Sequence, residues 1–481
     1  MTVQAAEASA KYKVTTTNNG ESAGNAGAIS GLDESVAEVP PGYKQTEVGL
    51  VPEEWQVEQI GVLAEFVTSG SRGWAQFYSE TGALFIRSQN VRDGQLSFDD
   101  VQFVSPPSGA EGNRTKVSLN DLLITITGNS VGNVALVEKD FDEAYISQHV
   151  GLVRLREPTT GSYVCRYLSP NSPGNPQISG SQSGQSKPGL NLQNLRDLWV
   201  AYPPNAKELQ AIIKVLSDVD ALINGLEKLI SKKQAIKTAT MQQLLTGRTR
   251  LPQFAHRDDG SLKGHKPSEL GDVPEDWEVK SVRSVISDYF CGPSPTCEER
   301  NIVEGEEWGV LKTTASTVER GWDWKSHKVL PKAFWNNSRI ELRKGDVIVT
   351  KAGPRHRVGI AATIDYIPDA IVPSGKMIAI RPIPSLIHPR MLSLAIMGKG
   401  SQEYLNQRTT GMAEAQLNYE NEDLLNTPII VQDIEEQTAI STILSDMDEE
   451  IQTLQQCLSK TRQLKQGMMQ ELLTGRTRLV S

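Results

Sequence analysis

The chain has 481 residues, of which 38% are hydrophobic and 22% charged, and its formal net charge is −9. This is the composition of an ordinary globular protein of about two to four domains, and no apolar run approaches the roughly 20 residues needed to cross a bilayer. The excess of acid excludes a protein that coats nucleic acid by bulk positive charge, and the four scattered cysteines suggest neither a disulfide framework nor a metal site.

The first stretch, residues 1–40, is rich in Ala, Ser, Asn, Gly and Glu and has no periodic apolar pattern, so we expect a disordered leader. It lacks the basic start and apolar core of a signal peptide, which indicates a cytoplasmic protein without membrane association. Residues 41–205 follow as a first globular domain. Its short apolar runs, separated by Gly, Asn and Ser turns, predict mostly strands.

From residue 206 the apolar residues are spaced alternately three and four apart, which is typical of a coiled-coil seam. We expect a helix over 206–247, a polar linker over 248–266, a second strand-rich domain over 267–433, a second helix over 434–476 and a tail over 477–481. Gly247 and Gly475 are expected to end the helices. The predicted seam residues are Leu209, Ile212, Leu216, Val219, Ile223, Leu226 and Ile230 in the first helix, and Ile440, Leu444, Met447, Ile451, Leu454 and Leu458 in the second.

The sequence also contains a tandem duplication. Residues 241–251 recur as 469–479 with a single difference in eleven positions, and the Pro-Glu-Glu-Trp of 52–55 recurs as Pro-Glu-Asp-Trp at 274–277. The repeat is too long for a solenoid unit, so each copy is a domain plus its helix. Matching ends around dissimilar middles suggest one scaffold that carries two different binding surfaces.

Two seams of equal length in one chain can bury each other, and an antiparallel pairing would return the C-terminus to the first domain. We therefore predict an α+β protein, in which two mixed, strand-rich α/β domains are joined by two long antiparallel coiled-coil helices in a pseudo-twofold dumbbell. The identity of the two tails is best explained by two copies of one partner protein, one bound at each end. The candidate contacts in the tails are Arg248, Arg250, Arg476 and Arg478.

Several motifs occur once in each half. A Pro-x-x-Trp entry lies at 52–55 and 274–277, an apolar helix opens after a Pro-containing strand end near Lys207 and Glu435, and a closing Leu-Leu-Thr-Gly-x-x-Arg begins at Leu244 and again at Leu472. The segments 85–91 and 309–313, and 121–128 and 345–353, form further pairs. With this combination of motifs, the chain after residue 40 resembles the DNA-specificity subunit of type I restriction-modification systems.

The resemblance implies a non-catalytic reader that serves DNA methylation and phage defence. Each variable domain would be a target recognition domain for one half of a split, asymmetric sequence of double-stranded DNA, and the helices would set the spacer. Two adenine-N6 methyltransferase subunits would dock on the helices, and restriction subunits would join them. The chain itself would bind no metal or cofactor, because S-adenosylmethionine, Mg and ATP would be held by the partner subunits.

The residues agree with an absence of catalysis. The sequence contains no Gly-rich phosphate loop that ends in Gly-Lys-Ser or Gly-Lys-Thr. It also contains no Asn- or Asp-Pro-Pro-aromatic segment of the kind that adenine methyltransferases use, so we predict no catalytic residues.

Base reading requires side chains that match the groove edges, mainly Arg or Lys for guanine and Asn or Gln for adenine, and loops next to strands are the places to look. In the first domain we select Arg72, Trp74, Arg87, Asn90, Arg92, Asn129, Ser130, Gln185 and Lys187. In the second we select Lys312, Thr313, Lys351, Arg355, His356, Arg357, Lys376, Arg408 and Thr410.

Two alternatives stay open. The chain could serve a fused methyltransferase-nuclease of type IIB style, which a neighbouring partner gene would distinguish. It could also be a coiled-coil scaffold whose end domains bind proteins, and an assembled complex without any DNA sequence preference would favour that hypothesis.

Overall fold

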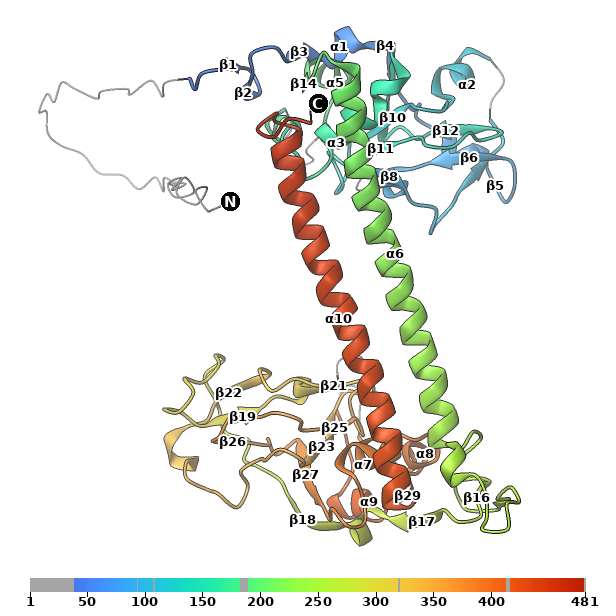
Figure 1. Cartoon of the computed structure of the whole chain (residues 1–481), viewed down its shortest axis with the longest axis vertical. Helices are drawn as coiled ribbons and strands as arrows, with labels where there is room; N and C mark the ends of the chain where they lie inside the picture. Colours follow the sequence, from blue (N-terminus) through green and yellow to red (C-terminus); the bar gives the residue numbers. More distant parts are fainter. Residues whose placement is uncertain are drawn as a thin grey trace, which may run out of the picture.

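The computed structural model describes residues 39–92, 94–106, 109–181, 189–318, 321–411 and 416–479, so the expected leader lies outside the described residues up to 38. Two globular heads lie at opposite ends of a pair of long helices, α6 (Ala206–Leu245) and α10 (Ile434–Leu472) (Figure 1). We call residues 43–202 the first head, residues 265–431 the second head and the helix pair the shaft. Figure 1 shows the first head extending from the α6 side of the shaft and the second from the α10 side.

The first head is built on two four-stranded sheets, ordered β11-β10-β13-β4 and β12-β6-β9-β5. The strands are β1 (Tyr43–Thr46), β2 (Gly49–Pro52), β3 (Gln56–Gln59), β4 (Ala64–Ser69), β5 (Tyr78–Ser79), β6 (Ala83–Ile86), β7 (Val91–Arg92), β8 (Gln95–Leu96), β9 (Phe103–Val104), β10 (Leu122–Thr125), β11 (Val134–Leu136), β12 (Ala144–Ile146), β13 (Val150–Leu155) and β14 (Trp199–Tyr202). The α-helices are α1 (Ile60–Leu63), α2 (Ala110–Thr115), α3 (Gly161–Leu168), α4 (Pro176–Gly180) and α5 (Leu192–Asp197), with 3-10 turns η1 (Trp74–Phe77), η2 (Ser88–Asn90) and η3 (Pro158–Thr160).

The central strand β10 is an uninterrupted apolar run because both of its faces are covered. Successive side chains of a strand point to opposite faces. Accordingly, Leu122 and Ile124 belong to one buried cluster, with the α3 helix and the start of α6, whereas Leu123 belongs to another cluster toward β12. A continuous apolar run therefore marks a strand at the centre of this head.

The second head repeats this architecture. Its main sheet has the order β18-β27-β23-β25, which corresponds strand for strand to β4-β13-β10-β11, and its second sheet has the order β22-β19-β26. The strands are β15 (His265–Lys266), β16 (Val273–Pro274), β17 (Glu278–Ser281), β18 (Ile286–Phe290), β19 (Gly309–Leu311), β20 (Ser316–Thr317), β21 (Gly321–Trp322), β22 (His327–Val329), β23 (Val347–Thr350), β24 (Ala352–Gly353), β25 (Ala361–Thr363), β26 (Ile371–Val372), β27 (Met377–Pro382), β28 (Leu417–Asn418) and β29 (Pro428–Val431). The α-helices are α7 (Pro389–Ile396), α8 (Lys399–Arg408) and α9 (Asn421–Leu425), with 3-10 turns η5 (Val282–Val285), η6 (Thr313–Ala315) and η7 (Lys332–Phe334). One more 3-10 turn, η4 (Pro252–Phe254), lies between α6 and this head.

A buried ion pair joins the same two strands in each head. Asp121, just before β10, accepts from Arg154 of β13 at 2.8 and 2.7 Å. Asp346, just before β23, accepts from Arg381 of β27 at 2.8 and 2.9 Å. The middles that look dissimilar in sequence therefore share one folded frame.

The helices of the shaft run in opposite directions. Ion pairs join Asp220 to Lys465 at 2.7 Å, Glu227 to Arg462 at 2.6 Å and Lys233 to Glu450 at 2.6 Å. As the residue number rises in α6 it falls in α10, which is the signature of an antiparallel pair. At 1.5 Å per residue each helix is about 60 Å long. Among the described residues, no helix is both long and apolar enough to cross a membrane.

The predicted seam residues do not all serve the helix pair. In the middle of the shaft, Leu226, Ile230 and Ile451 are buried. The predicted residues Val219, Ile223, Met447, Leu454 and Leu458 are half-buried.

The first turns of both helices are instead part of the head cores, which corrects the expectation of one continuous seam. Leu209, Ile212 and Leu216 pack in the first head, together with Met469, Leu472 and Leu473 from the end of α10. Ile440 and Leu444 pack in the second head, together with Leu244 from the end of α6. Each head core is therefore completed by the end of the other helix.

Candidate nucleic-acid interface

Each head presents one sheet edge at which three loops meet. In the first head this edge is formed where β4 and β10 end and β13 begins, at residues 69–71, 125–127 and 147–149. In the second head the corresponding segments end β18 and β23 and precede β27, at residues 290–292, 350–352 and 374–376. We call these the first and second edges.

The backbone frame of the two edges is the same. Ile126 N–H donates to His149 O at 2.9 Å, and Lys351 N–H donates to Lys376 O at 2.8 Å. The turn before β13 is closed by a hydrogen bond that Val150 N–H donates to Ser147 O at 2.9 Å. The turn before β27 is closed in the same way, by Met377 N–H donating to Ser374 O at 3.0 Å.

A glycine of the neighbouring strand end packs on each turn. A Cβ on Gly70 would lie 2.2 Å from the carbonyl carbon of Ser147, and a Cβ on Gly292 would lie 1.6 Å from Pro373 O. No larger residue fits at either glycine, because a backbone atom of the turn lies where its Cβ would be, so each turn packs directly against the neighbouring strand end.

The side chains on the first edge form hydrogen-bonded sets. Thr127 Oγ1 contacts His149 Nδ1, and Gln148 Nε2 lies 3.1 Å from His149 Nε2. Gln148 and His149 are both exposed. On the same edge Arg114 of α2 donates to Ser69 O at 2.8 Å and to Ser71 Oγ at 2.6 Å. Sequence reasoning missed Gln148 and Arg114, because neither belongs to a motif that distinguishes it from other surface residues.

The second edge carries cations. Lys376 is exposed at the position that corresponds to His149. Lys351 is less available than predicted, because its Nζ donates to Asn421 Oδ1 at 2.9 Å and lies 3.8 Å from Glu420. Nearby, Arg357 is half-buried and its Nη1 is a buried nitrogen without a hydrogen-bond partner among the described residues.

Three of the other candidates in the first head make structural contacts instead. Trp74 is buried and stacks on Phe85, with ring centroids 5.6 Å apart. Asn90 is buried and donates to Asp100 O at 2.8 Å, and Arg87 pairs with the Asp100 carboxylate at 3.0 Å. These contacts within the chain account for the three side chains, so a contact with DNA is not needed to explain them.

The remaining candidates of the first head lie on the surface or outside the described residues. Arg72, Arg92 and Asn129 are exposed and Ser130 is half-buried. Gln185 and Lys187 lie outside the described residues.

The remaining candidates of the second head are a mixed set. Lys312 pairs with Glu299 at 3.2 Å, and Arg408 covers the Tyr404 ring at 3.4 Å from its centroid. Arg355, His356 and Thr410 are exposed and Thr313 is half-buried.

The repeated tails dock on the heads of this same chain. Arg478 donates to Glu208 at 2.6 and 2.7 Å and also to Glu54, while Arg250 donates twice to Glu436 at 2.7 Å and to Asp276 at 2.9 and 3.1 Å. Glu208 and Glu436 are fully buried.

The electrostatics of the tail contacts follow from this geometry. The hydrogen bond from Arg478 lowers the pKa of Glu54. Burial alone would raise the pKa of Asp276, but hydrogen bonds from Arg250 and Lys263 lower it to about 2.

Only glycine fits at one position in each tail, because the backbone there has a positive φ and packs closely against a proline ring. Gly247 and Gly475 have φ of 69° and 70°, and a Cβ on them would lie 2.3 and 2.4 Å from Pro274 Cγ and Pro52 Cγ.

The structure thus gives an intramolecular reason for the identity of the tails and corrects their interpretation as partner contacts at Arg250 and Arg478. Arg248 and Arg476 are exposed and stay candidate contacts. The expected linker is also folded onto the second head, since Arg257 pairs with Glu275 at 2.6 Å.

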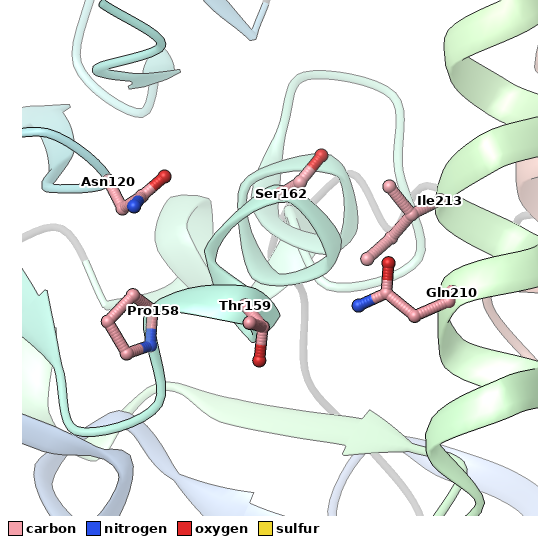
Figure 2. A pocket seen from close by; sticks show the side chains of 6 residues that line it. All are labelled: Asn120, Pro158, Thr159, Ser162, Gln210 and Ile213. Carbon is pink, nitrogen blue, oxygen red and sulfur yellow. The ribbon is translucent and has the colours of Figure 1, made fainter.

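Two hollows open beside the start of α6. One, of about 270 Å³, is lined by Asn120, Pro158, Thr159, Ser162, Gln210 and Ile213, and Figure 2 shows Gln210 pointing from α6 toward the 158–162 segment. The other, of about 300 Å³, is lined in part by Tyr163, Tyr202 and Leu209. Neither lining contains a residue of the first edge. Within the described ranges, no group of three or more His, Cys, Asp or Glu residues is arranged to hold a metal ion.

Comparison with known proteins gives matches to the specificity subunits of type I restriction enzymes. The family model described as the type I restriction modification DNA specificity domain matches residues 52–238 and 274–460, which is more than half of the chain. The chain is similar to the type I restriction enzyme EcoEI specificity subunit of Escherichia coli, at 30% identity over 179 residues, which are 36% of this chain and 30% of that subunit. It is also similar to the type I restriction enzyme MjaVIII specificity subunit of Methanocaldococcus jannaschii, at 24% identity over 448 residues, which are 91% of this chain and 96% of that subunit.

Solved structures show the same fold. The type I restriction-modification S subunit from M. genitalium has a TM-score of 0.52 at 14% identity, with 87% of this chain and 96% of that chain covered. A second structure comes from work on complex assembly and conformational transition of the type I restriction-modification system. It has a TM-score of 0.50 at 17% identity, with 89% of this chain and 99% of that chain covered.

Proposed function

The chain belongs to the type I restriction-modification DNA specificity family, whose members are non-catalytic, and from this premise we propose that its two heads each read one half of a split, asymmetric DNA sequence. DNA recognition as part of a restriction-modification complex follows from the family. The division of the site between the heads is the step that we add.

The observation that carries this proposal is the repetition of one frame with two different surfaces. The Asp-Arg pair, the strand order and the hydrogen bonds of the edge turn recur in both heads, while the exposed side chains on the edges differ. Such a pair of heads is suited to present different readers in the same orientation. An asymmetric target is what two unlike readers on one scaffold would select.

The shaft supports a fixed spacing between the half-sites. A helix pair of about 60 Å exceeds one turn of DNA, which is roughly 34–36 Å. An antiparallel shaft with one copy of the frame at each end has an approximate twofold axis across its middle. Surfaces of the two heads that point along this axis face the same way. The two heads could therefore contact one duplex from the same side, with unread base pairs between them.

An exposed apolar row on α6 supports docking of partner subunits along the shaft. Leu222, Leu229 and Ile236 are 53%, 39% and 41% exposed and lie seven residues apart, so they share one face of the helix. We call these three residues the α6 stripe. We propose that helices of two adenine-N6 methyltransferase subunits cover the shaft here, and that restriction subunits join that core.

This arrangement divides the chemistry between subunits. The methyltransferase subunits would hold S-adenosylmethionine, and the restriction subunits would use Mg and ATP. The present chain would supply base contacts, with its partners contributing much of the attraction to the DNA backbone, as its net charge of −9 suggests.

Sequencing of methylated adenines in the genome of cells that express this chain with its methyltransferase subunit tests the proposal. We expect one motif with two specified, unlike parts and a fixed number of unspecified base pairs between them. An assembled complex that methylates at a single continuous motif, or without sequence preference, would contradict it.

A further inference from the structure

The turns at the two edges occupy the same place in the same frame but carry different chemistry. Residues 147–149 read Ser-Gln-His, and the corresponding residues 374–376 read Ser-Gly-Lys. The backbone of each turn is fixed by a glycine packed against it and by two equivalent hydrogen bonds. The side chains at the second and third positions are the part of each turn that is free to differ.

In the first head a chain of hydrogen bonds orients the amide of Gln148. A side-chain amide nitrogen can only donate, so in the 3.1 Å contact His149 Nε2 is the acceptor. The imidazole proton is then on Nδ1, from which it donates to Thr127 Oγ1. One N–H of Gln148 is used by His149, and its second N–H and its carbonyl oxygen remain on an exposed side chain.

That remaining pair of groups matches one base edge. A glutamine amide that offers a donor and an acceptor together can bind N7 and N6 of adenine in the major groove. The packing of the head does not require this side chain, because it is exposed and its backbone is already held. The geometry therefore fits a reader of adenine whose orientation is set before DNA binds.

In the second head the corresponding turn offers donors only. Gly375 has no side chain, and a Cβ there would lie 2.5 Å from Ser294 Oγ, so Ser294 would have to move to admit one. Lys376 is exposed and carries an ammonium group with donors and no acceptor. In the major groove such a group matches O6 and N7 of guanine.

We propose that the two turns are equivalent base-reading positions, at which the first head reads an adenine with Gln148, positioned by His149, and the second head reads a guanine with Lys376. This inference rests on the proposed function and specifies part of each half-site.

The test exchanges the turn chemistry in the assembled complex. The substitutions Gln148→Gly and His149→Lys place the second head's turn in the first head. The reverse exchange is less direct, because a side chain at Gly375 would also displace Ser294. We expect the methylated motif to change from adenine to guanine at one position of one half-site, with the other half and the spacer unchanged.

Single substitutions separate reading from positioning. Gln148→Ala should lower the preference for adenine at that position by about 5- to 150-fold. His149→Ala should relax the same position, and His149→Gln should restore it because the new side chain can still accept from Gln148. The matched control is Gln45→Ala, which removes an exposed glutamine on β1 and should leave the motif unchanged.

The second head is tested with Lys376→Ala, with Lys399→Ala on α8 as the matched control for the loss of an exposed lysine. Loss of one guanine from the second half-site would support the inference. A uniform loss of affinity across sequences with a weaker salt dependence would assign Lys376 to a phosphate and overturn its role. An unchanged motif for the exchanged turn in a complex that still methylates a split site overturns the inference alone, whereas a wild-type complex without a split site overturns the proposed function.

Discussion

Removal of the Arg478 side chain is expected to destabilise the first head strongly, because its main partner is fully buried. Glu208 accepts two hydrogen bonds from this guanidinium, at 2.6 and 2.7 Å. Breaking a buried ion pair by removing one partner costs about 3–5 kcal/mol. Arg478 is itself 25% exposed, so water can reach part of the site, and we expect a loss near the lower end, about 3 kcal/mol, for Arg478→Ala.

Native-state hydrogen exchange is the appropriate assay, since the two heads are separate units and a single unfolding midpoint would mix them. A loss of about 3 kcal/mol corresponds to exchange that is roughly 100-fold faster for the slowest amides of the first head. Amides of the second head serve as the internal reference. Arg476→Ala removes an exposed arginine from the same tail and should change stability by less than about 0.5 kcal/mol.

A second variant separates loss of the pair from loss of packing. In Arg478→Ala with Glu208→Leu no buried carboxylate is left unpaired, so the double variant should exchange more slowly than Arg478→Ala alone. Equal exchange in the wild-type chain and Arg478→Ala, or equal effects of Arg476→Ala and Arg478→Ala, would refute the assignment of the tail to an intramolecular contact.

Further predictions concern the tail, its pH dependence and the shaft. Gly475→Ala should destabilise the first head by about 1–3 kcal/mol because of its positive φ. Gly467→Ala, in open space within α10, should instead stabilise the protein by about 0.5–1 kcal/mol. Hydrogen exchange of the slowest amides of the first head in both variants checks this, and equal effects would argue against it. Because the pKa of Asp276 is lowered from 3.8 to about 2, its contribution to stability is present above pH 3.8 and is lost as the pH falls through 2. About 1–2 kcal/mol of acid sensitivity in this range should vanish in Asp276→Asn. Hydrogen exchange of the amides of the second head, compared between wild type and variant at each pH, measures this, and an unchanged profile would count against the ion pair. Replacing the three residues of the α6 stripe by Gln should abolish co-purification of the methyltransferase subunit. The helix content measured by circular dichroism should stay the same. Undiminished co-purification would place the docking surface elsewhere.

The long helices and the doubled frame could be predicted from the sequence because their signals are periodic or repeated. Heptad spacing at Leu226 and Ile230 reports a helix whatever the helix packs against. The same spacing continues through Leu209 and Ile212, which are buried in the core of the first head together with the end of α10. Periodicity identifies which face of a helix is buried, but it does not identify the neighbour.

The candidate interface was harder to predict, because the availability of a charged side chain depends on its partners in space. Arg87 and Lys312 match the composition of a DNA reader, yet Asp100 and Glu299 bind them. Gln148 had no motif to reveal it. The register of β13 and β27 shows that Gln148 corresponds in position to Gly375, although the two turns do not align in sequence.

Exchange of one head tests the central claim most directly, namely that two unlike heads on a fixed shaft read two half-sites independently. Residues 41–205 would be replaced by the first domain of another family member, and methylated adenines would be mapped in cells that express the hybrid with its methyltransferase subunit. We predict that one half of the motif changes while the other half and the spacer length are retained. Simultaneous change of both halves would contradict independent reading by the two heads.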